Sequence, residues 1–283
     1  MILETFGYTA PTSLSDAVAA LAGDPAVCPL AGGDGLITLL KRGQLQPSLL
    51  VDLQYLEALR GVHLFGDGKL RIGAMTTLSA LLADRAVRLS HLPGVLGDAV
   101  AVTGDPQARN RATVGGTLAA GHPGSDLAAA MLALAASANV VGPAGHRSVP
   151  VGDLFDIGGT GRLAHGELIV SVDLPPAESG SGYERLADRA TLDAVCGVAA
   201  TVALAQDGTL ARCRLAVTGA TLFPCRLGAV ERSLVGAATP VAVPPVTATF
   251  MDDRLGSAEY RAELTRVLAG RAVARAVTRA RTS

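Results

Sequence analysis

Two short glycine-rich stretches, residues 31–36 (AGGDGL) and 113–117 (TVGGT), constrain the fold of this chain more than any other feature. Glycine has no Cβ, so the main chain can adopt positive φ there and come close to a ligand. Successive main-chain N–H groups in such a stretch form a concave site that binds anions. Together with residues 121–126 (GHPGSD), the two stretches predict a site for a ligand that carries a pyrophosphate and polyol hydroxyls.

Length and composition indicate a globular protein. With 283 residues, the chain can bury a core in two domains, or in one domain with subdomains. Hydrophobic residues make up 49% and charged residues 17%, which excludes a disordered chain. The formal net charge is −1, so we expect no nucleic acid among the partners.

The cysteines and histidines give no metal-binding pattern. The four cysteines are widely spaced and form no C-x-x-C pair, and no His–Cys spacing is typical of zinc. An iron–sulfur cluster needs clustered thiolates, which this chain does not supply. We therefore expect four inert thiols and no metal site.

The longest apolar stretch, about residues 127–141, is too short for a membrane span, which needs about 20 residues. We expect a core helix followed by a strand there, and no membrane span. Residues 1–4 (MILE) lack the basic and apolar segments of a secretory signal. These features favour a cytoplasmic location.

The N-terminal region has a βα-like pattern. Ser13 is positioned to cap a helix with Leu14, Ala17 and Leu21 on one face. We then expect a buried strand over 27–30, a helix over 36–41 and a strand over 49–53. This order places the first glycine stretch at the carboxyl end of a strand, where ligands commonly bind.

The rest of the chain alternates between further predicted elements. We expect strands at 70–73 and 168–174, helices at 78–89 and 95–102, an irregular polar segment at 103–112, a helix capped by Ser125 or Asp126, and a hairpin over 139–149. Residues 175–182 (PPAESGSG) have the composition of a linker. After them we expect strands at 195–205 and 211–217, joined at Asp207-Gly208, and helices at 227–235 and 258–281.

At three places the chain resembles a known family. Residues 31–36, residues 106–117 (PQARNRATVGGT) and residues 258–261 (AEYR) before an Arg-rich helix look like the FAD-binding medium subunits of molybdenum hydroxylases. The resemblance covers nearly the whole chain. It implies an α+β protein with a PCMH-type FAD-binding domain at 1–175, made of two α/β subdomains at about 1–55 and 56–175. A C-terminal domain at 176–283 would contain a three-stranded antiparallel sheet and a helical bundle.

The resemblance also implies which residues bind FAD in a crevice between the subdomains. The first stretch would hold the pyrophosphate or nearby ribityl oxygens, and the second would add Thr hydroxyls and main-chain N–H groups. Asp126 would accept hydrogen bonds from sugar hydroxyls. Ile169 would pack against the flavin ring, and Arg185 would be a cation near that ring. The implied contacts are Ala31, Gly32, Gly33, Asp34, Gly35, Leu36, Thr103, Thr113, Val114, Gly115, Gly116, Thr117, Asp126, Ile169 and Arg185. No catalytic residue is implied.

Each assignment has a structural alternative, and three positions depart from the family pattern. A Gly-Gly pair can be a simple turn, the second stretch a helix start, Asp126 an N-cap, and Arg185 a surface charge. Asp34 and Gly35 stand where the family has Gln or His and then Ser, so a carboxylate lies near the expected phosphates. Ala194 stands where the family often has an aromatic residue. Arg109 and Arg111 can neutralise phosphate or face a partner subunit.

By resemblance, the chain would be one subunit of a three-subunit oxidoreductase. A small subunit would carry two [2Fe–2S] clusters and a large subunit the molybdopterin cofactor, with electrons passing through FAD to an external acceptor. Two alternatives remain at this point: a free-standing FAD-dependent enzyme acting on a small metabolite, and a degenerate scaffold subunit without FAD.

Overall fold

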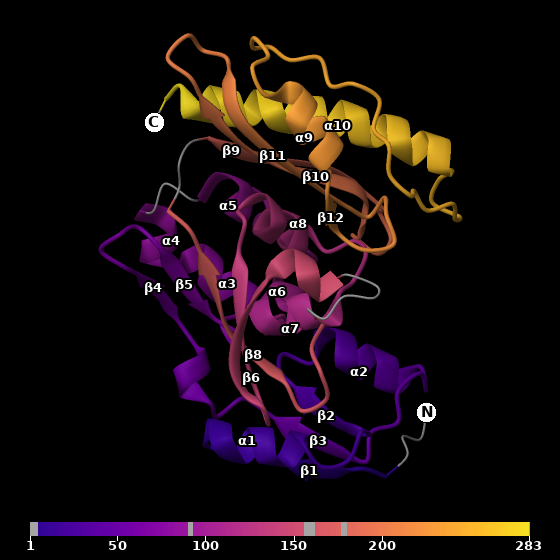
Figure 1. The fold of residues 1–283 in the computed structure, drawn as a ribbon. Helices are drawn as coiled ribbons and strands as arrows, with labels where there is room; N and C mark the ends of the chain where they lie inside the picture. Colours follow the sequence, from indigo (N-terminus) through magenta and orange to yellow (C-terminus); the bar gives the residue numbers. More distant parts are fainter. Residues whose placement is uncertain (1–4, 90–92, 156–161, 177–179, 283) are drawn as a thin grey trace.

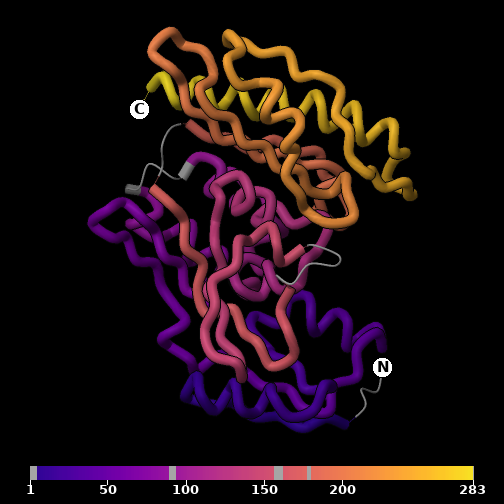
Figure 2. Tube along the Cα trace, viewed as in Figure 1, coloured from indigo at the N-terminus to yellow at the C-terminus, as the bar shows by residue number. Residues whose placement is uncertain are grey.

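Three β-sheets follow one another along the chain and form three stacked layers (Figure 1). The computed structural model describes residues 5–89, 93–155, 162–176 and 180–282. The N-terminal sheet lies at one end, a five-stranded sheet with its helices lies in the middle, and the C-terminal sheet lies at the other end. The tube view shows the same order, with the indigo and yellow parts of the chain farthest apart (Figure 2).

The N-terminal layer confirms the predicted βα pattern. It consists of β1 (Gly7–Thr9), α1 (Leu14–Leu21), β2 (Val27–Leu30), α2 (Asp34–Lys41) and β3 (Leu49–Asp52). The strands are parallel, in the order β1-β3-β2. Ser13 caps α1 by accepting a hydrogen bond from the Asp16 amide at 3.1 Å. The first glycine stretch therefore follows the carboxyl end of β2, as expected.

The middle layer is an antiparallel sheet in the order β4-β5-β8-β6-β7. Its elements are η1 (Glu57–Leu59), β4 (Val62–Leu64), β5 (Leu70–Gly73), α3 (Leu78–Ala83), α4 (Arg85–Leu89), α5 (Pro93–Val102), α6 (Pro106–Arg111), α7 (Val114–Ala120), α8 (Asp126–Ala133), β6 (Ser137–Gly142), β7 (Gly145–Pro150), η2 (Val151–Phe155) and β8 (Leu168–Leu174). Every residue of α8 is buried, so the expected core helix followed by a strand is confirmed.

Two predictions in this layer are wrong in detail. The expected helix at 78–89 is two helices, because Asp84 has an extended backbone and accepts a hydrogen bond from the Ala86 amide at 2.7 Å. The expected irregular segment at 103–112 contains α6. Asp105 caps this helix by accepting from the Ala108 amide at 2.7 Å, and Pro106 occupies its first turn, where a missing N–H costs nothing.

The C-terminal layer is an antiparallel sheet in the order β12-β11-β10-β9. It consists of β9 (Ser181–Ala187), β10 (Ala194–Leu204), β11 (Leu210–Thr218), the short β12 (Cys225–Arg226), α9 (Gly228–Leu234) and α10 (Ala258–Ala280). The expected three strands are present, and β12 adds a fourth. Within the described part of this layer, the helices are α9 and the 23-residue α10.

The C-terminal sheet lies between helices from two layers. α10 covers its outer face, and α5 and α8 of the middle layer pack against its inner face (Figure 1). The layers are thus in close contact, and the domain boundaries at about 55 and 175 remain predictions. Residues 1–4, and residues 177–179 of the expected linker, lie outside the described residues; Ser181 already belongs to β9. No helix among the described residues is long and apolar enough to cross a membrane.

Candidate cofactor site

The first glycine stretch has main-chain amides that are available to a ligand. From Ala31 to Leu36, no amide donates a hydrogen bond to another described residue. Gly33 caps α2 with φ of +75°, a conformation that favours glycine, and no side chain caps this helix end. A Cβ on Gly35 would meet no atom within 4 Å. These six amides, three of them in the first turn of a helix, suit an anionic group.

The second stretch differs, because its amides already have partners. The amides of Val114 and Gly115 donate to the carbonyl oxygens of Thr76 and Ala74, at 3.0 and 2.8 Å. The Gly116 amide donates to Oγ1 of Thr113, which is the N-cap of α7. The expected cradle of free Gly115 and Gly116 N–H groups is therefore not what the hydrogen bonds show. Gly115 instead allows close packing, since its Cβ would lie 2.6 Å from that of Ala74.

The two stretches lie against each other in the fold. A Cβ on Gly32 would overlap the carbonyl oxygen of Arg111, the last residue of α6. A Cβ on Gly116 would lie 3.4 Å from the Cβ of Ala31. The second stretch thus forms part of the wall on which the first stretch rests, and the predicted convergence of the two is confirmed.

The polar side chains at this junction differ in exposure. Asp34 is exposed in the first turn of α2, and Thr117 is partly exposed in α7, where its hydroxyl has no hydrogen-bond partner among the described side chains. Thr113 is only 3% exposed. Its hydroxyl oxygen serves the cap of α7, so Thr117 is the more accessible hydroxyl of the second stretch.

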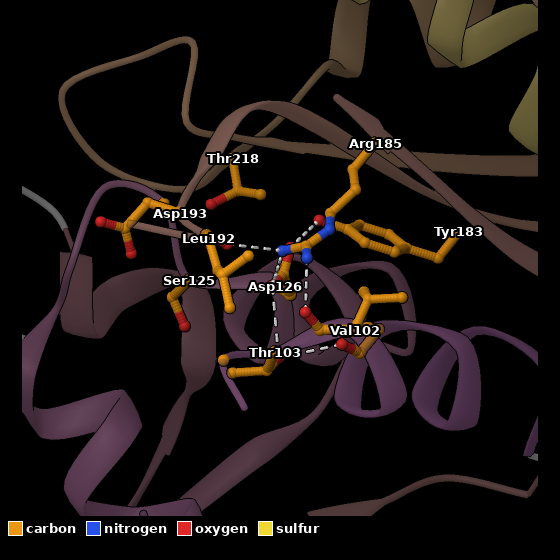
Figure 3. A network of polar contacts seen from close by, with 12 residues as sticks. Val102, Thr103, Ser125, Asp126, Tyr183, Arg185, Leu192, Asp193 and Thr218 are labelled. Atoms are coloured by element: carbon orange, nitrogen blue, oxygen red, sulfur yellow. Dashed lines mark hydrogen bonds and ion pairs between the residues drawn. The ribbon is translucent and has the colours of Figure 1, made fainter. Parts of the chain in front are cut away.

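Three further predicted residues meet at the start of α8 (Figure 3). The Asp126 carboxylate, at the start of α8, accepts hydrogen bonds from Oγ1 of Thr103 at 3.2 Å, from Nη1 of Arg185 at 2.8 Å and from the hydroxyl of Tyr183. Thr103 follows α5, and the other two donors come from β9. The N-cap alternative for Asp126 is wrong, because the Ser125 hydroxyl caps α8. We call these four side chains the Asp126 cluster.

Burial controls the protonation of this cluster. Asp126 is 2% exposed, and burial raises its carboxyl pKa to about 6, although hydrogen bonding by Tyr183 and the charge of Arg185 act in the opposite direction. Burial, followed by the nearby Asp126 charge, raises the pKa of Tyr183 well above its usual value. The three donors occupy much of the hydrogen-bond accepting capacity of the Asp126 carboxylate. Asp126 therefore fixes the positions of the Thr103, Tyr183 and Arg185 side chains.

Arg185 joins three segments of the chain. Besides Asp126, its guanidinium donates to the carbonyl oxygens of Leu192 and Val102, at 3.1 and 2.5 Å (Figure 3). Leu192 has φ of +61°, which is uncommon for a leucine. The side chain of Arg185 is 14% exposed, so the surface-charge alternative does not describe it.

The C-terminal layer also holds the segment that leads into α8. The carbonyl oxygen of Pro123 accepts hydrogen bonds from the Gly219 amide at 2.7 Å and from the Thr218 hydroxyl at 2.6 Å. Ala194 is buried, and its main-chain N and O would lie 3.3 Å from a Cβ on Gly124. His122 is exposed, and its Nδ1 accepts from the Gly124 amide, which is a loop contact.

Ile169 lies in β8 as a core residue with 6% exposure. The next residue, Val170, accepts a hydrogen bond from the Ala74 amide at 3.0 Å, and Ala74 in turn contacts Gly115. Ile169 is therefore next in the chain to Val170, which binds Ala74, and Ala74 packs against Gly115 of the second stretch. Its contact with a flavin ring stays a prediction.

Sequence reasoning missed Tyr183 and Arg261. Tyr183 lies two residues before Arg185 on the same strand, so the period-two alternation of a strand was the available signal. Arg261 is 1% exposed and donates to the carbonyl oxygens of Val195 and Gly219. Arg261 is the last residue of the AEYR stretch at 258–261 that carries part of the resemblance, but the resemblance gave it no role.

The geometry fits an extended ligand with an anionic centre. Helix α7 has seven residues and spans about 10 Å, at 1.5 Å per residue. The open amides lie near its start, because Gly116 packs on Ala31, and Asp126 begins the next helix, α8. Main-chain amides suit a phosphate, and hydroxyl, guanidinium and carboxylate groups suit sugar hydroxyls.

Known proteins are similar to this chain in sequence and in fold. Residues 4–177 match the family described as the FAD binding domain in molybdopterin dehydrogenase. The carbon monoxide dehydrogenase medium chain of Afipia carboxidovorans is 34% identical over 292 residues, covering 99% of this chain and 100% of that one. A putative xanthine dehydrogenase FAD-binding subunit of Escherichia coli is 33% identical over 230 residues, covering 80% and 78%.

A solved structure agrees with the sequence comparisons. The crystal structure of a Cu,Mo-CO dehydrogenase in its cyanide-inactivated form contains a chain that superposes with a TM-score of 0.87 at 31% identity, covering 99% of this chain and 100% of that one. The chain therefore belongs to the family of FAD-binding domains of molybdopterin dehydrogenases, and FAD is its cofactor.

Proposed function

We propose that this chain is the FAD-binding subunit of a molybdenum hydroxylase complex, in which FAD receives electrons from iron–sulfur clusters on a partner chain and delivers them to an external acceptor. Family membership supports the proposal, as does the similarity over nearly the whole chain to a protein named as the medium chain of a dehydrogenase. Bound FAD supplies the redox chemistry, and the protein binds and orients it.

The proposed position of FAD depends on the open amides of the first stretch. In this proposal, the amides from Ala31 to Leu36 donate to the pyrophosphate, because they lack partners among the described residues. The Thr117 hydroxyl is the donor that the second stretch adds. Gly115 and Gly116 contribute by letting the segments pack closely, which holds the first stretch in place.

The Asp126 cluster is proposed to flank the sugar and ring end of FAD. Asp126 holds Thr103 and Arg185 in place, and its remaining accepting capacity is available to a sugar hydroxyl. Arg185 is the cation of this region, which suits the negative charge of a reduced flavin. Ile169 is the proposed apolar neighbour of the ring.

The proposed partners are a small subunit with [2Fe–2S] clusters and a large subunit with molybdopterin. Within the described ranges, no three His, Cys, Asp or Glu side chains gather to hold a metal ion, and all four cysteines are free thiols. Burial raises the pKa of Cys196 to about 11 and that of Cys213 to about 12, which disfavours the thiolate that a cluster needs. In this proposal, the ligands of the [2Fe–2S] clusters lie on another chain.

Purification of the native complex through a tag on this chain tests the proposal. We expect co-purification of two other subunits, with FAD, iron and molybdenum in constant ratio to the protein, by mass spectrometry and metal analysis. Recovery of this chain alone with FAD, and oxidation of a metabolite by it, would support the free-standing enzyme instead. Recovery without FAD would support the scaffold alternative.

A further inference from the structure

Arg111 carries a positive charge beside the open amides of the first stretch and has no partner among the described residues. It is the last residue of α6 and is exposed. Its guanidinium forms no hydrogen bond or ion pair with any residue in the described ranges. Arg109, by contrast, donates to the carbonyl oxygens of Thr103 and Gly104, at 3.0 and 2.9 Å, and so completes the end of α5.

The packing of the loops fixes where Arg111 lies. Its carbonyl oxygen occupies the space that a Cβ on Gly32 would take, so its backbone rests directly on the first stretch. Its Nη2 would lie 3.2 Å from a Cβ on Gly33. The charged end of the side chain is therefore held next to the residue that begins the row of amides in α2.

Asp34 creates an electrostatic problem at the same place. It follows Gly33 directly, is exposed, and belongs to the row of open amides. A carboxylate this close to a pyrophosphate repels it, although it also interacts favourably with the dipole of α2. Arg111 and Asp34 form no ion pair in the structure, so the guanidinium is available to a ligand.

The geometry points to Arg111 as a phosphate-binding residue that offsets Asp34 and lets this loop hold the pyrophosphate of FAD. The inference rests on the proposed placement of FAD on the first stretch. It explains how a loop with a carboxylate can serve a ligand with two negative phosphates. It also separates the roles of the two arginines: Arg109 supports the fold and Arg111 contacts the ligand.

Titration of the full-length apoprotein with FAD, followed by flavin fluorescence at low and high salt, tests the inference. Arg111→Gln should raise the FAD dissociation constant roughly 5- to 10-fold and flatten its salt dependence, the size expected for one partly exposed charge pair. Arg111→Lys should keep most of the affinity. Arg42→Gln is the matched control, because Arg42 is an exposed arginine at the other end of α2. Asp34→Asn in the Arg111→Gln background should restore affinity.

The outcomes distinguish this inference from the proposed function. If wild-type protein binds FAD while Arg111→Gln and Arg42→Gln give the same dissociation constant and salt dependence, Arg111 has no such role and the proposed function stands. If the wild-type chain does not bind FAD, both are overturned. Thermal unfolding of each apo variant, expected to match the wild type, shows that the effect is on binding.

Discussion

The two glycine stretches look alike in the sequence and do different work in the fold. Amides in the first stretch, from Ala31 to Leu36, have no partner among the described residues, whereas those of Val114, Gly115 and Gly116 are hydrogen-bonded within the chain. The first stretch follows an edge strand and runs into a helix that lacks a side-chain cap. The second pairs with residues 74–77 and has a threonine cap. A glycine pair can thus serve a ligand or serve packing, and the hydrogen-bond partners decide which.

Gly32→Ala should have the largest effect, because it breaks the contact between the two stretches. The new methyl would overlap the carbonyl oxygen of Arg111, which belongs to main chain and cannot rotate away. We expect a loss of about 2–4 kcal/mol in the free energy of unfolding, as for overpacked sites, and loss of FAD from the purified protein. Urea unfolding measures the loss of stability, and the flavin absorbance spectrum measures the loss of FAD. Unchanged stability would mean that the stretches do not touch.

Gly35→Val and Gly115→Ala should give opposite patterns and so sharpen the comparison. A side chain at position 35 meets no protein atom within 4 Å, whereas one at position 115 meets Ala74 at 2.6 Å. We expect Gly35→Val to weaken FAD binding about tenfold or more with stability within about 0.5 kcal/mol, because it fills the space before the open amides. Gly115→Ala should cost about 1–3 kcal/mol of stability and change the affinity of the folded protein less.

Gly23→Val is the matched control for this pair, since Gly23 is also exposed and a Cβ there also meets nothing within 4 Å. It should leave both FAD affinity and stability near wild type. FAD titration and thermal unfolding of all three variants are required. If Gly115→Ala weakens FAD binding as much as Gly35→Val does while stability is kept, the second stretch also contacts the ligand directly.

The smallest expected effect is a pH dependence of stability. It arises from the Asp126 cluster and not from the two glycine stretches. Burial raises the pKa of Asp126 from 3.8 to about 6, so the folded chain binds this proton more tightly than the unfolded chain. Its contribution to stability is therefore present at low pH and is lost as pH rises through that range. Between pH 5 and 7 the loss is roughly 1 kcal/mol. Comparison of urea unfolding for wild type and Asp126→Asn at both pH values should show it; equal pH dependence would contradict it.

Much of the fold could be predicted from local patterns. Short apolar runs located β2 and β3, the turn at residues 143–145 located the hairpin of β6 and β7, and helical periodicity located α1. The segment with α6 was misjudged because its polar residues resemble a loop. The Asp105 cap followed by Pro106 was a usable helix-start signal that outweighs polarity.

The candidate site was predictable in position and less so in chemistry. Glycine spacing identified both stretches, and their contact is confirmed by the packing of Gly32 on Arg111. The partners of the Gly115 amide lie about forty residues earlier in the chain, so no local pattern reveals that this amide is used. Two of the three donors to Asp126, Tyr183 and Arg185, come from β9, more than fifty residues later, so no local pattern reveals them either.

The position of these donors has a consequence for how the chain can be divided. The family match ends at residue 177, yet Tyr183 and Arg185, which neutralise and hold the buried carboxylate of Asp126, come after it. Pro123 likewise relies on hydrogen bonds from residues 218 and 219. Severing the chain at the edge of the family match would remove two of the three donors to Asp126 and uncover the face of α5 and α8 on which the C-terminal sheet packs. The family match therefore ends before the residues on which the matched part of the chain depends for its hydrogen bonds.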